Sequence, residues 1–392
     1  MSSVNFLEKL LDGVEVEWKT LGQTCKIETG KLNANAAVDD GEYMFFTTAK
    51  ETSKIDKFRW DTEALLIAGN ANVGEVKHYI GKFEAYQRTY VLTNFDENVS
   101  VRFLYFVLSH SLKKYLEERT NSAAMTYIVL STLENFPIPI PCPGNPQKSL
   151  AIQSEIVRIL DKFTALTAEL TAELNMRKKQ YNYYRDQLLS FDEEQEKPIY
   201  LEKLLDGVEV EWLPLSDLAR IRNGKDHKSL SEGEFPVYGS GGIMRYVDTY
   251  AYNKPSVLIP RKGSLGNLFF IDVPFWTVDT IFYTEIDEAQ IRPKYLYYFL
   301  STVGLGEMNQ AGGVPSQTQS VLNKLKIPIP CPDNPEKSLA IQSEIVRILD
   351  KFDTLTNSIT EGLPREIELR QKQYEYYRDL LFSFPKPETI SN

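Results

Sequence analysis

Residues 138–163 read IPIPCPGNPQKSLAIQSEIVRILDKF, and residues 327–352 read IPIPCPDNPEKSLAIQSEIVRILDKF. The two stretches differ at only two pairs of positions, Gly144 against Asp333 and Gln147 against Glu336. Two unrelated surfaces would not converge to this extent, so the repeat indicates a duplicated structural unit. Each copy opens with alternating prolines and continues with apolar residues at helical spacing, which predicts a stiff extended segment followed by a helix.

The start of each helix is marked by a polar residue and a proline. Asn145 and Asn334 each precede a proline, which biases them towards extended or turn conformations. Ser149 and Ser338 follow, and serine is a favoured N-cap residue. We therefore predict that the two helices begin at these serines.

Two shorter repeats accompany the first. LEKLLDGVEVEW opens each half at residues 7–18 and 201–212, and YYRD closes each half at residues 183–186 and 376–379. We call these repeated blocks the frames. Two stretches between them share almost no identity, and we call residues 19–136 and 213–326 the first and second inserts. Near-identical frames around different inserts predict that the frames perform one symmetric task and the inserts two different ones.

The inserts have the pattern of mixed sheet and helix. Short β-branched and aromatic runs separated by turn residues predict strands at 43–46, 64–67, 90–92, 256–259, 268–271 and 280–283. Each insert then has a helical run, at 101–116 and 294–300. The predicted fold class is therefore α+β.

The frame helices are predicted to be long. Their apolar residues recur in steps of three and four, as at Phe163, Leu166, Leu170 and Leu174, and at Phe352, Leu355, Ile359 and Leu363. This spacing makes a coiled-coil stripe. Either helix alone would expose its stripe, so the two helices are expected to pack against each other.

The two frame helices differ in length and regularity. The second is four residues longer between matching aspartates, which predicts about one extra helical turn. Gly362 and Pro364 predict a break or kink in it. The first helix instead contains a perfect tandem Thr-Ala-Glu-Leu, Thr167–Leu170 and Thr171–Leu174, which has the character of a length adjuster.

Composition bounds the class of protein. At 392 residues the chain is long enough for two or three domains, and its 42% hydrophobic and 25% charged residues are typical of a soluble globular protein. No apolar run reaches the roughly 18 residues of a membrane span, and the N-terminal residues do not form a signal peptide. These features predict a cytoplasmic protein with no membrane contact.

The net charge of −10 taken alone argues against nucleic acid, but residues 217–270 hold eight Lys/Arg against five Asp/Glu.

Few residues suit metal or thiol chemistry. Three cysteines, Cys25, Cys142 and Cys331, support no disulfide framework, and we expect them to be small buried apolar residues. Three histidines lack a second ligand at metal spacing, so no metal site is predicted. No methyltransferase motif, cofactor loop or Walker A sequence occurs. We therefore predict a non-catalytic chain that binds no cofactor itself.

Residues suited to DNA are found in short polar segments of the inserts. Arg261, Lys262 and Ser264 share a glycine-containing turn after a predicted strand. Two interpretations remain open: the turn contacts phosphates or base edges, or it is simply a solvated basic turn. The corresponding place in the first insert holds Asn70 and Asn72. The loop Gly239–Gly242 lacks the lysine of a P-loop, so it is expected to be a turn, with close approach to a DNA phosphate as the alternative. Further polar candidates are Asn33, Asn35, Thr47, Thr48, Tyr86, Gln87 and Arg88.

Taken together, the chain resembles the specificity subunits of type I restriction–modification systems. The resemblance covers nearly the whole chain and rests on the twin frames, and the tandem Thr-Ala-Glu-Leu is similar to the IC branch. In the second insert, residues 236–243, with Tyr238, Ser240 and Gly241, and residues 258–266 look like a common target-recognition domain. The first insert departs from this pattern, because Phe46-Thr47-Thr48 stands where Tyr-Gly-Ser-Gly is expected.

The resemblance implies an architecture and a set of partners. Two target-recognition domains, residues 1–140 and 199–329, would each read half of a split duplex DNA site in the major groove. Residues 141–198 and 330–392 would supply two long antiparallel coiled-coil helices, with Thr167, Leu170, Thr171 and Leu174 in the spacer. Two methyltransferase subunits would dock on the frames and restriction (motor) subunits would join them. S-adenosylmethionine, ATP and Mg²⁺ would belong to these partners.

Two other classes of function are weighed against this one. A non-catalytic two-armed helical scaffold without DNA binding fits the acidic net charge. A self-contained nuclease or methyltransferase is disfavoured by the missing motifs. The sequence does not specify which bases are read.

Overall fold

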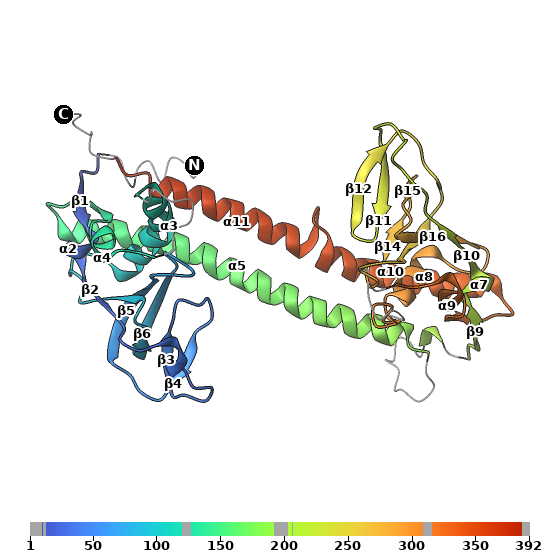
Figure 1. The fold of residues 1–392 in the computed structure, drawn as a ribbon, viewed down its shortest axis with the longest axis horizontal. Coiled ribbons are helices and arrows are strands. Elements are labelled where there is room, and N and C mark those ends of the chain that lie inside the picture. The colour runs from blue at the N-terminus through green and yellow to red at the C-terminus, as the bar shows by residue number, and fades with distance from the viewer. Residues whose placement is uncertain are drawn as a thin grey trace. The chain divides into compact units, whose positions relative to one another are not determined.

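The computed structural model describes residues 10, 13–119, 127–191, 203–205, 207–308 and 316–385. The chain divides into two compact units: the first contains residues 1–169 and 367–392, and the second contains residues 170–366. Each unit combines one insert with parts of both frames (Figure 1). The predicted α+β class is confirmed in both.

In the first unit, a six-stranded sheet has the order β2-β7-β5-β6-β3-β4. Its strands are β2 (Lys26–Thr29), β3 (Tyr43–Phe46), β4 (Ser53–Ile55), β5 (Trp60–Ala68), β6 (Val76–Ala85) and β7 (Thr89–Thr93). The helices are α2 (Leu21–Thr24), α3 (Val101–Arg119) and α4 (Leu130–Glu134), with a 3-10 turn at Ala34–Ala36. All three strands and the helix predicted in this insert are confirmed.

In the second unit the insert forms two smaller sheets, β10-β16-β13-β14 and β12-β11-β15. The strands are β10 (Ala219–Asn223), β11 (Phe235–Gly239), β12 (Gly242–Val247), β13 (Ser256–Pro260), β14 (Phe269–Ile271), β15 (Trp276–Thr277) and β16 (Ile281–Ile286). The helices are α7 (Leu215–Leu218), α8 (Pro293–Leu300) and α9 (Gln319–Leu322). The predicted elements are again present; β16 begins one residue after the expected start and runs three further.

The repeated blocks pair with one another in the same register in each half. Strand β1 (Val16–Thr20) pairs antiparallel with β8 (Pro137–Pro141), and β9 (Val210–Pro214) with β17 (Lys326–Pro330). Trp18 faces Pro139 in the first ladder, and Trp212 faces Pro328 in the second. The opening block and the proline-rich block of each half therefore form one structural element.

The frame helices begin earlier than predicted. Helix α5 (Pro146–Leu189) and helix α10 (Pro335–Asn357) each start at the proline, which is favoured in the first turn because its missing N–H has no helical partner. Asn145 and Asn334 accept hydrogen bonds from the backbone N–H groups of Lys148 (3.1 Å) and Lys337 (3.0 Å). The asparagines therefore cap the helices. Ser149 and Ser338, predicted as caps, instead lie buried inside the first turns.

A buried glutamine on each frame helix holds the helix of the adjoining insert. Gln153 accepts a hydrogen bond from the backbone N–H of Ser100 (2.8 Å) and donates to the carbonyl of Asn98 (2.9 Å), just before α3. Gln342, its repeat counterpart, accepts from the N–H of Arg292 (2.7 Å) and donates to the carbonyl of Gln290 (3.1 Å), just before α8. Both glutamines are fully buried. The same frame residue thus orients two different inserts.

A second matched contact lies eight residues, or about two helical turns, further along each frame helix. Asp161 accepts from the guanidinium of Arg102 (Nε, 3.0 Å), and Asp350 accepts from Lys294 (2.8 Å) and from the hydroxyl of Tyr298 (2.6 Å). Arg102 and Lys294 each lie two residues after the N–H held by the glutamine. An ion pair between frame and insert is therefore present in both halves, with different cations.

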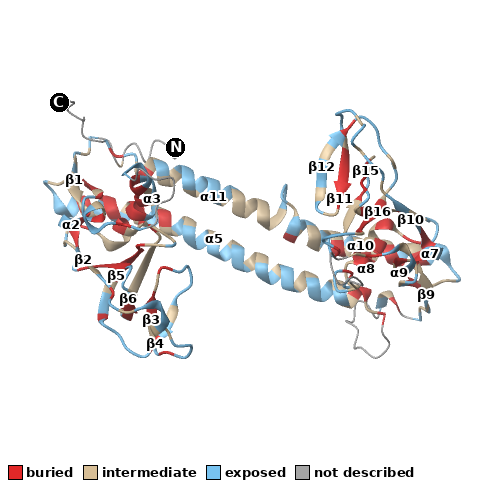
Figure 2. Cartoon of the chain, viewed as in Figure 1, coloured by how far each residue is buried: buried red, intermediate tan, exposed pale blue. Residues whose placement is uncertain are grey.

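The predicted packing of the frame helices is confirmed within each unit. In the first unit, Phe163 of α5 stacks on Tyr377 of α11 (Gly362–Leu381), with ring centroids 5.3 Å apart. In the second, Tyr184 of α5 stacks on Phe352 of α10 at 5.4 Å. Residues 161–187 of α5 contain no buried residue, whereas the globular part of each unit has a continuous apolar core (Figure 2). The boundary between the units falls within α5, between Glu169 and Leu170, inside the tandem repeat.

The sequence suggested that the four extra residues of the second frame add a helical turn, but they do not. Helix α10 ends at Asn357 and α11 begins at Gly362, so residues 358–361 are the non-helical connection, and the predicted break is confirmed. Gly362 has φ +80°, and a Cβ there would lie 2.4 Å from the carbonyl oxygen of Thr354, so glycine is required. With 23 and 20 residues, the two shorter helices nearly match the 44 of α5.

The cysteines only partly follow expectation. Cys25 is buried, and this burial raises the pKa of its thiol to about 12. Cys142 and Cys331 are only partly buried, because each lies at the turn that follows β8 or β17. Both have left-handed backbones, with φ +49° and +51°. Their N–H groups donate across the ladder to the backbone carbonyls of Glu15 and Glu209. The duplicated turn is thus identical in conformation as well as in sequence.

Candidate nucleic-acid interface

The second insert brings two of the predicted polar segments together. The tip of the β11–β12 hairpin, at Ser240 and Gly241, lies beside the turn 261–267. The amide of Asn267 donates to the carbonyl of Ser240 at 3.5 Å, and the Ser240 N–H donates to the hydroxyl of Thr280 at 3.3 Å. Ser264 and Gly241 are exposed on this surface. The hairpin tip and the turn therefore form one polar surface.

The two cations of the turn point differently. The Arg261 guanidinium lies over the ring of the buried Phe282, 5.6 Å from its centroid, and Arg261 is half-buried. Lys262 is exposed, and its ammonium lies 3.7 Å from the carboxylate of Asp279. Of the two, Lys262 is therefore the better placed to reach a ligand.

A concavity opens next to this surface. Its volume is about 370 Å³, and it is lined by Asp226, His227, Lys228, Met244, Val278, Asp279 and Thr280. The Nδ1 atom of His227 is buried and has no hydrogen-bond partner among the described residues. These residues come from three separate segments, so sequence reasoning had no signal that placed Asp279 or His227 with the turn.

The two inserts present their loops in the same way. The carbonyl of Gly69 accepts from the N–H of Ile128 (2.8 Å), and the carbonyl of Arg261 accepts from the N–H of Gln317 (2.9 Å). The next residues also match, because Asn70 forms a bridge with Tyr127 and Lys262 forms one with Ser316. The structure therefore supports the predicted correspondence between loop 69–74 and turn 261–266.

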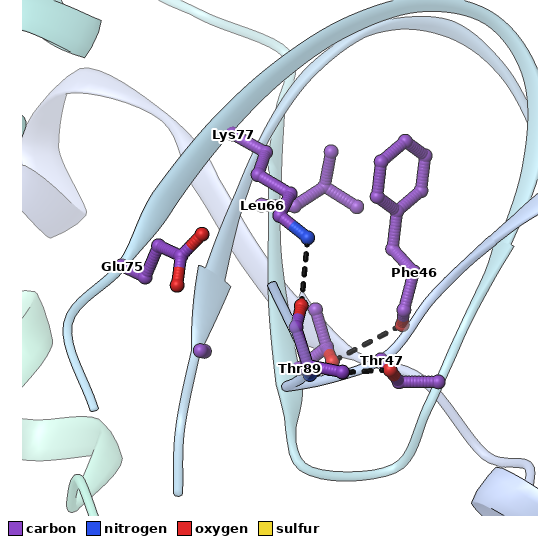
Figure 3. Close-up of a pocket in the computed structure, with 8 residues that line it drawn as sticks. Phe46, Thr47, Leu66, Glu75, Lys77 and Thr89 are labelled. Atoms are coloured by element: carbon purple, nitrogen blue, oxygen red, sulfur yellow. Dashed lines mark hydrogen bonds between the residues drawn. The ribbon is translucent and has the colours of Figure 1, made fainter. Parts of the chain in front are cut away.

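In the first insert, one predicted DNA contact, Asn72, has a structural role, and so does the neighbouring Lys77. Asn72 donates its amide to the carbonyl of Thr48 (2.8 Å), and Lys77 donates to the carbonyls of Ala49 (2.8 Å) and Lys50 (2.7 Å). Figure 3 shows Lys77 reaching across to this loop, beside Phe46, Thr47 and Thr89. The cavity drawn there is only about 10 Å³, at the limit for one water molecule, so it is not a ligand site.

Burial separates the predicted site residues into two groups. Thr48 is 8% exposed and Tyr238, which packs on Phe269, is 9% exposed, so little of either side chain is accessible to a duplex. Burial therefore argues against these two residues as DNA contacts. The assignment stays a prediction for the accessible residues Thr47, Asn70, Asn72, Arg88, Ser240, Gly241, Arg261, Lys262 and Ser264.

Among the described residues, no group of three or more His, Cys, Asp or Glu side chains is arranged to hold a metal ion. None of the helices in the described part of the chain is long and apolar enough to span a membrane.

Comparison with known proteins identifies this architecture. A family model described as the type I restriction modification DNA specificity domain matches twice, at residues 13–177 and 207–369, so each match joins one insert to its frames. The chain belongs to this family. Within it, the chain is 41% identical to the type I restriction enzyme EcoR124I/EcoR124II specificity subunit of Escherichia coli, over the full length of both chains. It is 33% identical to the EcoprrI specificity subunit of the same species, over 92% of this chain and 93% of that one.

Among solved structures, the fold of this specificity-family chain is similar to that of the S subunit of a type I restriction–modification system from M. genitalium. The TM-score is 0.64 with 20% sequence identity, over 96% of this chain and 98% of that one. A second match, from a structure on complex assembly and conformational transition of the type I R-M system, has a TM-score of 0.55 at 12% identity, covering 95% and 98%. These likenesses confirm the predicted fold, which two repeats of the specificity domain build.

Proposed function

We propose that this chain reads a bipartite, asymmetric duplex DNA site, with one half-site recognised by each insert. The observation that carries the proposal is the repeated attachment of two different inserts to identical frames through Gln153 and Gln342. Identical attachment presents equivalent loops, while different loop sequences supply different base contacts. Two recognition surfaces in one chain therefore give an asymmetric site.

The same proposal assigns partners to the frames. Because the frames are nearly identical in sequence and in register, they offer two equivalent docking surfaces, which suit two copies of one methyltransferase subunit. Restriction (motor) subunits would complete the assembly, in keeping with relatives named as type I restriction enzyme subunits. Adenine methylation and ATP-dependent cleavage would then be carried out by these partners, which would hold S-adenosylmethionine, ATP and Mg²⁺. This chain would be the non-catalytic subunit, located in the cytoplasm with the DNA.

Charge distribution shapes how DNA is bound. The net charge of −10 repels a polyanion, and the exposed cations occur in short segments such as Arg88 and Lys262. Neutralising phosphates along a duplex needs more positive surface than these segments supply. We therefore expect the isolated chain to bind DNA weakly and the complex with methyltransferase subunits to bind it tightly.

Salt-dependent binding distinguishes this function from a protein-only scaffold. The affinity of the full chain for a duplex that contains its site should be measured with and without methyltransferase subunits, from about 50 to 200 mM salt. We expect the logarithm of affinity to fall linearly with the logarithm of salt concentration, more steeply for the complex. A scrambled duplex of equal length is the control. Absence of binding by both chain and complex at the lowest salt would support the scaffold instead.

A further inference from the structure

Backbone hydrogen bonds hold the main-chain positions of Lys262 and Asp279, whose side chains form an ion pair. The N–H groups of Arg261 and Lys262 both donate to the carbonyl of Thr280, at 2.8 and 3.2 Å. Asp279 precedes Thr280 in a short turn closed by a hydrogen bond from the N–H of Ile281 to the carbonyl of Val278 (3.2 Å). The two backbone positions are thus locked together, with one donor and one acceptor side chain projecting side by side.

This pair contributes little to folding. Its N–O distance is 3.7 Å, and the side chains of Lys262 and Asp279 are 49% and 69% exposed. Exposed pairs of this kind have little effect on stability, since water screens them and the long side chains lose entropy when held. Lys262 and Asp279 can therefore separate and each bind a different partner at little cost in free energy. A partner that offers an acceptor and a donor side by side would satisfy both.

The presence of a carboxylate on this surface indicates contact with a base edge and not with phosphates alone. Phosphates repel carboxylates, so a surface that only gripped the DNA backbone would exclude Asp279 from beside Lys262. In the major groove, guanine presents two acceptors, N7 and O6, and its paired cytosine presents the N4 amino donor next to them. Lysine donates to guanine and aspartate accepts from cytosine. The donor–acceptor order of Lys262 and Asp279 is thus complementary to one G·C base pair.

We propose that Lys262 and Asp279 together read one G·C base pair of the second half-site, with Lys262 on guanine and Asp279 on cytosine. The proposal rests on the proposed function and adds a specificity-determining residue, Asp279, that the sequence did not single out. Arg261, held against Phe282, positions the turn. The neighbouring Ser240 and Ser264 lie on the same surface and are suited to flanking contacts.

Exchange of the two residues gives a sharp test, because reading the groove from one side, G·C and C·G present the same groups in opposite order. Four full-length chains should be compared, each in complex with its methyltransferase subunits: wild type, Asp279→Asn, the double variant Lys262→Asp with Asp279→Lys, and Asp272→Asn. Asp272 is also an exposed carboxylate; it follows Ile271 of β14, which pairs with Ser256 at the opposite end of β13 from the turn. The probe is a pool of duplexes randomised across the site, and bound sequences are read by sequencing.

The expected results differ by variant. Wild type and Asp272→Asn should select the same site, with G·C at one position of one half-site. Asp279→Asn should lose roughly tenfold of its preference at that position alone. The double variant should select C·G there, with the other half-site unchanged in every case. Unaltered folding of each variant is checked by its melting temperature.

Three outcomes overturn the inference in distinguishable ways. If wild type selects a bipartite site and the Asp279→Asn and double variants select the same site with the same stringency, the base-reading pair is wrong while the proposed function stands. If wild type selects no sequence from the pool, the proposed function fails and the inference fails with it. A uniform loss of affinity in the double variant, with no change of preferred base, would make Lys262 a phosphate contact and refute the pair.

Discussion

Insertion of one further Thr-Ala-Glu-Leu after Leu174 should lengthen the gap between the two half-sites without changing either half-site. The insertion point lies in the middle of α5, next to the boundary between the units. Four added residues extend a helix by about 6 Å, at 1.5 Å each. Stacked base pairs rise about 3.4 Å each. The expected increase is therefore about one to two base pairs.

The opposite side of the spacer has slack that can follow this change. Residues 358–361 connect α10 to α11 without being helical, and four extended residues span up to roughly 13 Å. Because this connection can extend, we expect the packing of Phe163 on Tyr377 in one unit and of Tyr184 on Phe352 in the other to be retained. The insertion also rotates the helix by only about 40° beyond a full turn, whereas one inserted residue rotates it by about 100°. A single-residue insertion should therefore disrupt packing.

The assay is to map methylated adenines in DNA modified by the complete complex that contains the wild-type chain, the four-residue insertion or the single-residue insertion. A third variant should combine the four-residue insertion with deletion of residues 359–361. We expect the wider gap only in the four-residue insertion, and weakened methylation when the slack is removed. An unchanged gap accompanied by altered half-site sequences would refute the spacer interpretation and place residues 167–174 in base recognition.

Two further predictions concern the frames. Gln342→Leu should cost about 1–3 kcal/mol of unfolding free energy for each backbone group that it leaves unpaired near Arg292, and it should lower the melting temperature by several degrees. The control Gln371→Leu, at an exposed position, should have almost no effect. Equal melting temperatures for the two variants would contradict this prediction. The mass of the assembly at saturating methyltransferase should correspond to two methyltransferase subunits per chain, because the two frames present the same surface, and a mass with only one would rule out equivalent docking.

Much of the fold could be predicted because periodic and repeated signals determine it locally. The strands of the inserts and the long frame helices follow from residue alternation and from steps of three and four. The helix starts were misplaced because Ser149 and Asn145 are both acceptable caps, and the preference of proline for the first turn decides between them. The break near Gly362 was predicted, but the four extra residues of the second frame were misassigned to a helical turn, because sequence length alone does not show that the connection at the break takes them up.

The site was predictable only in part. The turn at Arg261 and the loop at Asn70 were found because glycine and polar residues after a strand are a local signal. The burial of Thr48 depends on a contact with Asn72, far along the chain, and the position of Asp279 depends on a turn packed against Lys262. Such tertiary contacts leave no periodic trace in a single sequence.

The frame contacts explain how one chain holds two unrelated inserts. Gln153 and Gln342 bind the insert through backbone N–H and carbonyl groups, which every sequence provides at that place except proline at the donor. Asp161 and Asp350 each pair with a cation on the first turn of the insert helix, Arg102 in one half and Lys294 in the other, and Asp350 also accepts from the hydroxyl of Tyr298 one turn later. Because the attachment places so few demands on insert side chains, loops such as 69–74 and 261–266 are free to differ while their presentation stays the same. A change of recognised sequence in one insert should therefore leave both the opposite insert and the docking frames intact.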